Sequence, residues 1–154
     1  MLIRLIENTG YKYDETYRFY GYEYADRIAP IKDCGVKTIG EFYLRCLKAW
    51  SAETCSPRFR AQWSEDNPSV GQCTITAALV HEFFGGEVLG LPIENGTHSF
   101  NRIGGVIIDL ACEQFGKNAL LDFDSSVSVD ADSLLEKPDK QQRCDLLRKR
   151  LGMG

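Results

Sequence analysis

Residues 68–86 read PSVGQCTITAALVHEFFGG and predict a buried helix that begins at a cysteine. Pro68 and Ser69 favour a helix start, the glycine pair at 85–86 ends the pattern, and apolar residues recur between them at helical spacing. Cys73 is therefore expected in the first turn, where unpaired backbone N–H groups and the helix dipole lower the pKa of a thiol. A nucleophilic cysteine requires this environment.

The composition is that of an ordinary globular domain, because 44% of the 154 residues are hydrophobic and 26% are charged. The net charge of −4 argues against a nucleic-acid partner. No apolar run reaches the ~20 residues of a membrane span, and residues 1–7 are too short and too charged for a secretory signal. We therefore expect a cytoplasmic protein with no membrane partner.

The six cysteines are widely separated and include no C-x-x-C pair. Their even number permits a disulfide framework, but the length of the chain and the missing signal favour free thiols. A zinc site would need a short-spaced pair of ligands, and none is present, so we expect no metal and no other cofactor.

Residues 1–35 are interpreted as an N-terminal arm, and residues 36–154 as the main domain. Six of the seven tyrosines lie between Tyr11 and Tyr24, in alternations that predict a short hairpin with one aromatic face. This arm packs across the core or contacts a second copy or another protein. A stacking surface is less favoured because the segment lacks a cationic groove.

The rest of the chain predicts helices packed on an antiparallel meander. Thr38 and Glu41 form a capping box that starts a helix ending near Trp50, and residues 139–151 predict a closing helix. Strands are expected at 87–91, 98–103 and 106–110, with a short strand at 127–129. The fold class is therefore α+β.

The meander brings a histidine and a carboxylate together. A two-residue turn at 104–105 pairs Ile103 with Val106, which places His98 and Asp109 on one face of the sheet as diagonal neighbours. His81, the other histidine, is eight residues beyond Cys73 on the same helix and lies about 12 Å along its axis. Cys73, His98 and Asp109 thus supply a nucleophile, a base and a group that orients the base. All three could equally be structural residues.

Other side chains are candidates for the substrate cleft. The backbone N–H of Cys73 would be one oxyanion donor, and a side-chain amide from Gln72 or Gln62 would be the second. Asn101 and Trp63 would orient or cover the site.

Several short words of the sequence resemble the bacterial YunG-like family over about residues 39–151. They are Trp50-Ser51-Ala52-Glu53-Thr54, the run from Trp63 to Cys73, Phe84-Gly85-Gly86-Glu87, His98-Ser99-Phe100-Asn101, and Asp109-Leu110 with Glu113-Gln114-Phe115. The resemblance implies a papain-like or transglutaminase-like fold, with Cys73 as nucleophile, His98 as base and Asp109 as orienter. Ser99 and Ala111 replace an aromatic residue and a threonine that are usual in the family.

We therefore predict a small cysteine hydrolase or acyl-transfer enzyme that acts on an amide or isopeptide bond of a peptide or another amide-containing substrate, through a thioester. Peptidase, amidase, deamidase and transglutaminase-like activities all stay open. The alternative hypothesis is a non-catalytic binding or assembly module on a papain-like scaffold.

Overall fold

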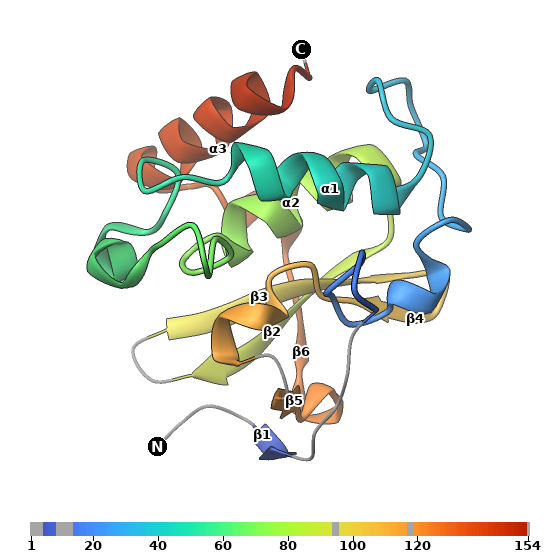
Figure 1. Cartoon of the computed structure of the whole chain (residues 1–154), viewed down its shortest axis with the longest axis horizontal. Helices are drawn as coiled ribbons and strands as arrows, with labels where there is room; N and C mark the ends of the chain where they lie inside the picture. Colours follow the sequence, from blue (N-terminus) through green and yellow to red (C-terminus); the bar gives the residue numbers. More distant parts are fainter. Residues whose placement is uncertain (1–4, 9–13, 94–95, 117–118, 154) are drawn as a thin grey trace.

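The computed structural model describes residues 5–8, 14–93, 96–116 and 119–153. The described helices are α1 (Ile39–Ala49), α2 (Cys73–Phe84) and α3 (Pro138–Leu151), with short 3-10 helices η1 (Tyr22–Tyr24), η2 (Pro57–Gln62), η3 (Cys112–Phe115), η4 (Phe123–Ser125) and η5 (Ala131–Ser133). The described strands are β1 (Leu5–Asn8), β2 (Glu87–Ile93), β3 (Gly96–Ile103), β4 (Val106–Ile108), β5 (Ala119–Leu121) and β6 (Val127–Val129). The chain is α+β, as predicted: the α-helices lie on one side of an antiparallel sheet, and the small β1–β5 sheet lies beyond its other side (Figure 1).

The main sheet has the strand order β4-β3-β2-β6, and all neighbours are antiparallel. Ile103 pairs with Val106 across the tight turn, which confirms the predicted register. β4 ends at Ile108, earlier than predicted, because the next residue pairs elsewhere. Asp109 donates its backbone N–H to the carbonyl of Tyr20 (3.0 Å) and accepts the Tyr20 N–H (3.3 Å).

The two faces of the sheet bury different clusters. α1, α2 and α3 pack with Ile108 and Leu110 in the main core. The opposite face of the sheet, with Leu91 and Phe100, packs against Leu121 of β5. The predicted start of α1 is confirmed, since the Thr38 hydroxyl accepts the backbone N–H of Glu41 (3.1 Å).

The N-terminal segment differs from the predicted hairpin. Its first alternation, Tyr11 to Tyr13, lies outside the described residues. The second forms η1 rather than a strand because Gly21 adopts a left-handed conformation (φ 96°), which reverses the chain. A Cβ at Gly21 would lie 2.5 Å from the carbonyl oxygen of Ile107, so only glycine fits. Phe19 (0% exposed) belongs to the same core as α1, so this segment packs on the domain.

All six cysteines are free thiols, and Cys73 is the most accessible of them. Within the described ranges, no helix combines the length and the apolar character that a bilayer crossing requires.

Candidate active site

Cys73 is the first residue of α2, and the start of this helix is held in place by the preceding residue, Gln72. The side chain of Gln72 is fully buried (0% exposed) and points away from the thiol. Its Nε2 donates to the Ser51 carbonyl (3.0 Å), and its Oε1 accepts from the Thr54 hydroxyl (2.8 Å). These bonds tie the loop after α1 to the start of α2 and leave Cys73 half-buried at the surface of the domain.

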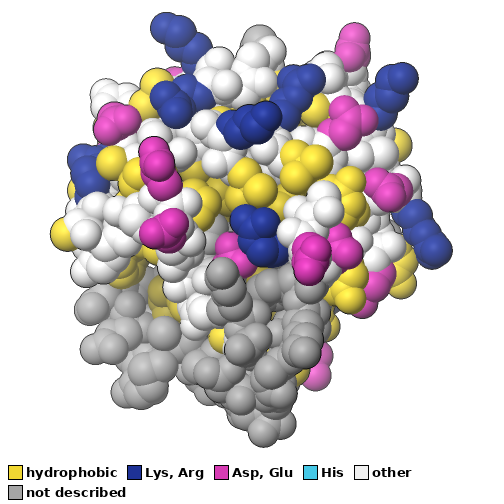
Figure 2. Space-filling view, viewed as in Figure 1, with side chains coloured by type: hydrophobic (Ala, Val, Ile, Leu, Met, Phe, Trp, Pro, Cys, Tyr) yellow, Lys and Arg dark blue, Asp and Glu magenta, His cyan; other side chains and the backbone are white. Residues whose placement is uncertain are grey.

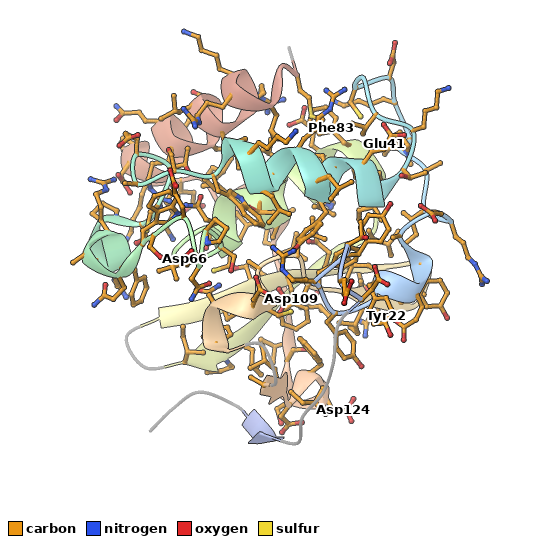
Figure 3. The ribbon with its side chains drawn as sticks, in the orientation of Figure 1. Tyr22, Glu41, Asp66, Phe83, Asp109 and Asp124 are labelled. Carbon is orange, nitrogen blue, oxygen red and sulfur yellow. The ribbon has the colours of Figure 1, made fainter. Side chains whose placement is uncertain are left out.

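His98 and Asp109 form a buried pair. Nε2 of His98 lies 2.6 Å from Oδ2 of Asp109, and the exposed fractions are 0% and 1% for the two side chains. The other carboxylate oxygen accepts the backbone N–H of Ala111 (3.2 Å), which fixes the carboxylate. Phe115 packs edge-on against the imidazole at 4.8 Å, and Phe100 stacks on it at 5.8 Å. Asp109 lies between the helical layer and the sheet (Figure 3).

The second ring nitrogen of His98 is left for the thiol. Nδ1 is buried and has no well-aligned hydrogen-bond partner in the described part of the chain. Burial raises the pKa of the Cys73 thiol, but the nearby imidazole of His98 and its positive charge outweigh burial and lower that pKa. Burial in turn disfavours the imidazolium, yet Asp109 and then Cys73 raise the pKa of His98 overall. The arrangement favours a thiolate–imidazolium pair.

The early end of β4 opens the sheet where this pair forms. Because Ile108 pairs with Asn101, β4 stops short of the part of β3 that carries His98 and Ser99, and no described strand pairs with that part on this side. The Ser99 backbone N–H donates to the Cys73 sulfur and lowers its pKa further. A free sheet edge thus supplies a donor for the thiolate.

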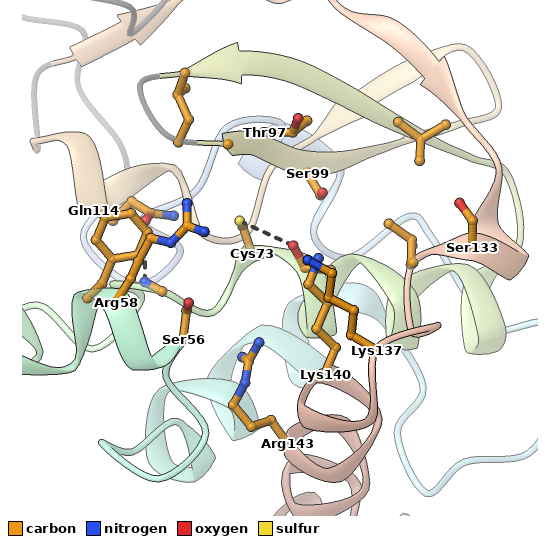
Figure 4. A pocket seen from close by; sticks show the side chains of 17 residues that line it. Ser56, Arg58, Cys73, Thr97, Ser99, Gln114, Ser133, Lys137, Lys140 and Arg143 are labelled. Atoms are coloured by element: carbon orange, nitrogen blue, oxygen red, sulfur yellow. Dashed lines mark hydrogen bonds between the residues drawn. The ribbon is translucent and has the colours of Figure 1, made fainter.

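Cys73 lines a pocket of about 410 Å³ between the start of α2, the start of α3 and the edge of the sheet (Figure 4). The described residues that line it are Ser56, Arg58, Phe59, Gly71, Cys73, Thr74, Ile93, Gly96, Thr97, Ser99, Gln114, Val129, Ser133, Leu134, Lys137, Lys140 and Arg143. A small ligand therefore has room beside the sulfur.

The family to which the chain is similar is matched over the part of the sequence that contains this site. The family model described as "YunG protein" matches residues 38–153, which include Cys73, His98 and Asp109. The chain belongs to the YunG family. It is 35% identical over 68 residues to "Uncharacterized protein YunG" of Bacillus subtilis (strain 168), and the match covers 44% of this chain and 55% of that relative. No solved structure matches the chain.

The structure places none of the four predicted cleft residues on this pocket, which corrects the expected cleft. Gln72 is turned inward, as described above, and Gln62 is exposed on η2. Trp63 donates its indole N–H to the Pro68 carbonyl (2.9 Å) and lines a separate hollow. Asn101 donates its amide to the Ala77 carbonyl (3.1 Å) and holds α2 on β3. Gln72 and Asn101 instead join segments that sequence spacing alone does not bring together.

Gln114 is the side-chain amide that does line the pocket. Its Oε1 accepts the backbone N–H of Gly71 (3.4 Å), and its Nε2 donates one proton to the Ala111 carbonyl (2.9 Å). Gln114 belongs to the short sequence Glu113-Gln114-Phe115 that resembles the YunG family, so the resemblance pointed to this region. The spacing of residues gave no reason to select the glutamine. The basic residues of the pocket carried no such signal. Within the described residues, no cluster of three or more His, Cys, Asp or Glu side chains could hold a metal ion.

Proposed function

We propose that this YunG-family protein is a small cysteine hydrolase or acyl-transfer enzyme that cleaves an amide or isopeptide bond through a thioester. The observation that carries the proposal is the chain of contacts from Asp109 through His98 to the Cys73 thiol, which ends at the wall of a pocket. Such a chain supplies a thiolate, a proton donor and a group that orients the imidazole.

The reaction uses these groups in turn. The Cys73 thiolate forms a bond to the carbonyl carbon, and the carbonyl oxygen takes the negative charge. When the oxyanion collapses, the C–N bond breaks, and the leaving amine takes the proton of the His98 imidazolium, which leaves a thioester and a neutral imidazole. His98 then accepts a proton from water as that water attacks the thioester, and the C–S bond breaks to restore the ion pair. An acceptor amine in place of water would give a new amide.

Two donors are suited to the oxyanion. The Cys73 backbone N–H belongs to the first turn of α2, where N–H groups have no intrahelical acceptor. Gln114 keeps the second proton of its Nε2, and it lines the same pocket. Loss of one such donor lowers kcat by about 10²–10³ in other enzymes. We assign Gln114 this role in place of Gln72 and Gln62.

The proposal also includes a papain-like or transglutaminase-like fold. It is supported by a cysteine at a helix start, a packed antiparallel sheet, and the chain order Cys73, His98, Asp109, with the histidine on β3 and the carboxylate directly after β4. A solved structure with another topology around these residues would contradict this assignment.

The proposed function is tested by the pH dependence of iodoacetamide alkylation at Cys73, followed peptide by peptide with mass spectrometry. The alkylation rate falls at acid pH as the thiolate is protonated, and we call this part of the profile the acid limb. We expect its midpoint well below the ordinary titration of a thiol near pH 8.5, because His98 stabilises the thiolate. The profile of the unchanged protein decides the question, since a limb at the ordinary value would refute the proposal. His98→Gln should move the limb to that value.

Accessibility is controlled within the same pocket. The double variant Cys73→Ser, Thr74→Cys moves the thiol one residue along α2, and Thr74 also lines the pocket. This displaced thiol lacks the contact with His98, so we expect it to titrate near the ordinary value. An equally low limb in both proteins would assign the effect to the helix start rather than to His98.

A further inference from the structure

The pocket beside Cys73 has a charge opposite to that of the chain as a whole. The chain has 22 acidic and 18 basic residues and a net charge of −4. Among the described residues that line the pocket, Arg58, Lys137, Lys140 and Arg143 are basic and none is acidic. On the face shown in Figure 2, by contrast, acidic and basic side chains are interspersed.

Three of the four cations are available for a ligand. Arg143 is buried (6% exposed) and engaged, because it donates to Asp139 (3.0 Å) and to the Thr54 carbonyl (3.1 Å). The side chains of Lys137 and Lys140 make no hydrogen bond or ion pair within the described ranges. The guanidinium of Arg58 lies over the Phe59 ring at 5.9 Å and pairs with no described carboxylate.

The lysines occupy a position that helices usually give to acidic residues. Lys137 is the N-cap of α3, and Lys140 lies in its first turn. Cations near a helix N-terminus are unfavourable because the dipole is positive there. The start of α3 also lacks a capping side chain. Two lysines at this end are explained if their charge is used by a ligand.

The cations surround the sulfur from two directions. Figure 4 shows Arg58 on one side of Cys73, and Lys137 and Lys140 reaching up from α3 on the other. The starts of α2 and α3 both open on this pocket, so the two helix dipoles add to the positive potential. Polar neutral groups of Ser56, Thr74 and Ser99 complete a lining suited to anion oxygens.

We propose that the substrate of this site carries an anionic group, a carboxylate or a phosphate, that is bound by Lys137, Lys140 and Arg58 next to the carbonyl attacked by Cys73. This inference rests on the proposed function and narrows its substrate class. The cations exclude cationic peptides and select acyl compounds with a negative charge a few bonds from the scissile amide.

The test compares two alkylating probes that differ in charge, iodoacetate and iodoacetamide, at the Cys73 sulfur. We expect the rate constant for iodoacetate, divided by that for iodoacetamide, to fall about fivefold to tenfold in the double variant Lys137→Gln, Lys140→Gln, because the anionic probe is no longer attracted by the two lysines. The ratio of the unchanged protein should also fall with added salt. The matched control is Lys48→Gln, Lys149→Gln, which removes the same charge from exposed positions outside this pocket.

The outcomes separate this inference from the proposed function. The low acid limb with iodoacetamide reports the thiolate, and the probe ratio reports the charge of the pocket. If the lysine variant leaves the ratio unchanged, or if the control changes it equally, the inference of an anionic substrate is overturned. This holds even when the iodoacetamide profile shows the low pKa that the proposed function predicts for Cys73.

The two anion chemistries are distinguished by protection of Cys73 from iodoacetamide at equal ionic strength. Stronger protection by inorganic phosphate than by glutarate assigns a phosphate, and the reverse order assigns a carboxylate. Protection by neither overturns the inference.

Discussion

Asp109→Asn tests the electrostatic core of the site with almost no change in side-chain volume. The carboxylate lies 2.6 Å from Nε2 of His98, and both groups are buried, so its charge acts on the imidazolium with little screening. Removal of an opposite charge at such a contact disfavours the charged form by about 1.4–4 kcal/mol. We therefore expect Cys73 to be alkylated about 10–10³ times more slowly below pH 7, with the acid limb displaced toward the ordinary value of a thiol.

The assay is the iodoacetamide profile of the variant, accompanied by its thermal unfolding to establish that it is folded. The matched control is Glu113→Gln, which also replaces a buried carboxylate (5% exposed) by an amide and removes an ion pair, that with Arg18 (3.1 Å). In the described part of the chain, Glu113 makes no hydrogen bond or ion pair with His98, so its substitution should lower stability and leave the profile of Cys73 in place. A folded Asp109→Asn protein with an unchanged profile would refute the assignment of Asp109 as the residue that orients and charges His98.

Three further predictions concern stability. Two hydrogen bonds from Arg148 lower the pKa of Glu82 from 4.5 to about 2. The ionised Glu82 therefore stabilises the folded protein above pH 4.5, and this stabilisation is lost as the pH falls through 2. In urea titrations, Glu82→Gln should lower the free energy of unfolding by about 1 kcal/mol at pH 7 and by almost nothing at pH 2. Gln72→Ala removes two buried hydrogen bonds, to the Ser51 carbonyl and from the Thr54 hydroxyl, and leaves a cavity, so it should lower the free energy of unfolding by about 2–4 kcal/mol. Exposed Gln62→Ala should lower it by less than about 0.5 kcal/mol. Gly104 and Gly21 both adopt a left-handed conformation. No atom lies within 4 Å of a Cβ built at Gly104, so Gly104→Ala should lower the free energy of unfolding by only about 1–2 kcal/mol. Gly21→Ala should lower the melting temperature further, because its Cβ would meet the backbone at Ile107.

Local patterns predicted the helices and the sheet register because their causes are local. The Thr38 cap fixes the start of α1, and the two-residue turn at 104–105 sets the pairing of Ile103 with Val106. From that register alone, the sequence placed His98 and Asp109 on one face, and the structure brings them into contact.

The parts that were not predicted depend on distant contacts. Gln72 faces inward because its partners, Ser51 and Thr54, come from a loop 21 and 18 residues earlier in the chain. The lysines of the pocket come from α3, more than sixty residues after Cys73, and no spacing rule connects them. The aromatic alternation at 20–24 failed as a strand because a single left-handed glycine outweighs β propensity.

The bridge between Tyr20 and Asp109 couples the site to a segment outside the family match, which begins at residue 38. Phe19 is wholly buried in the main core beside this bridge, so the segment cannot detach without exposing apolar surface. We therefore expect local opening of residues 14–37 to release the backbone of Asp109 from Tyr20 and to loosen the pairing of its carboxylate with His98. Hydrogen exchange at the Asp109 amide, which donates to the Tyr20 carbonyl, should report that opening.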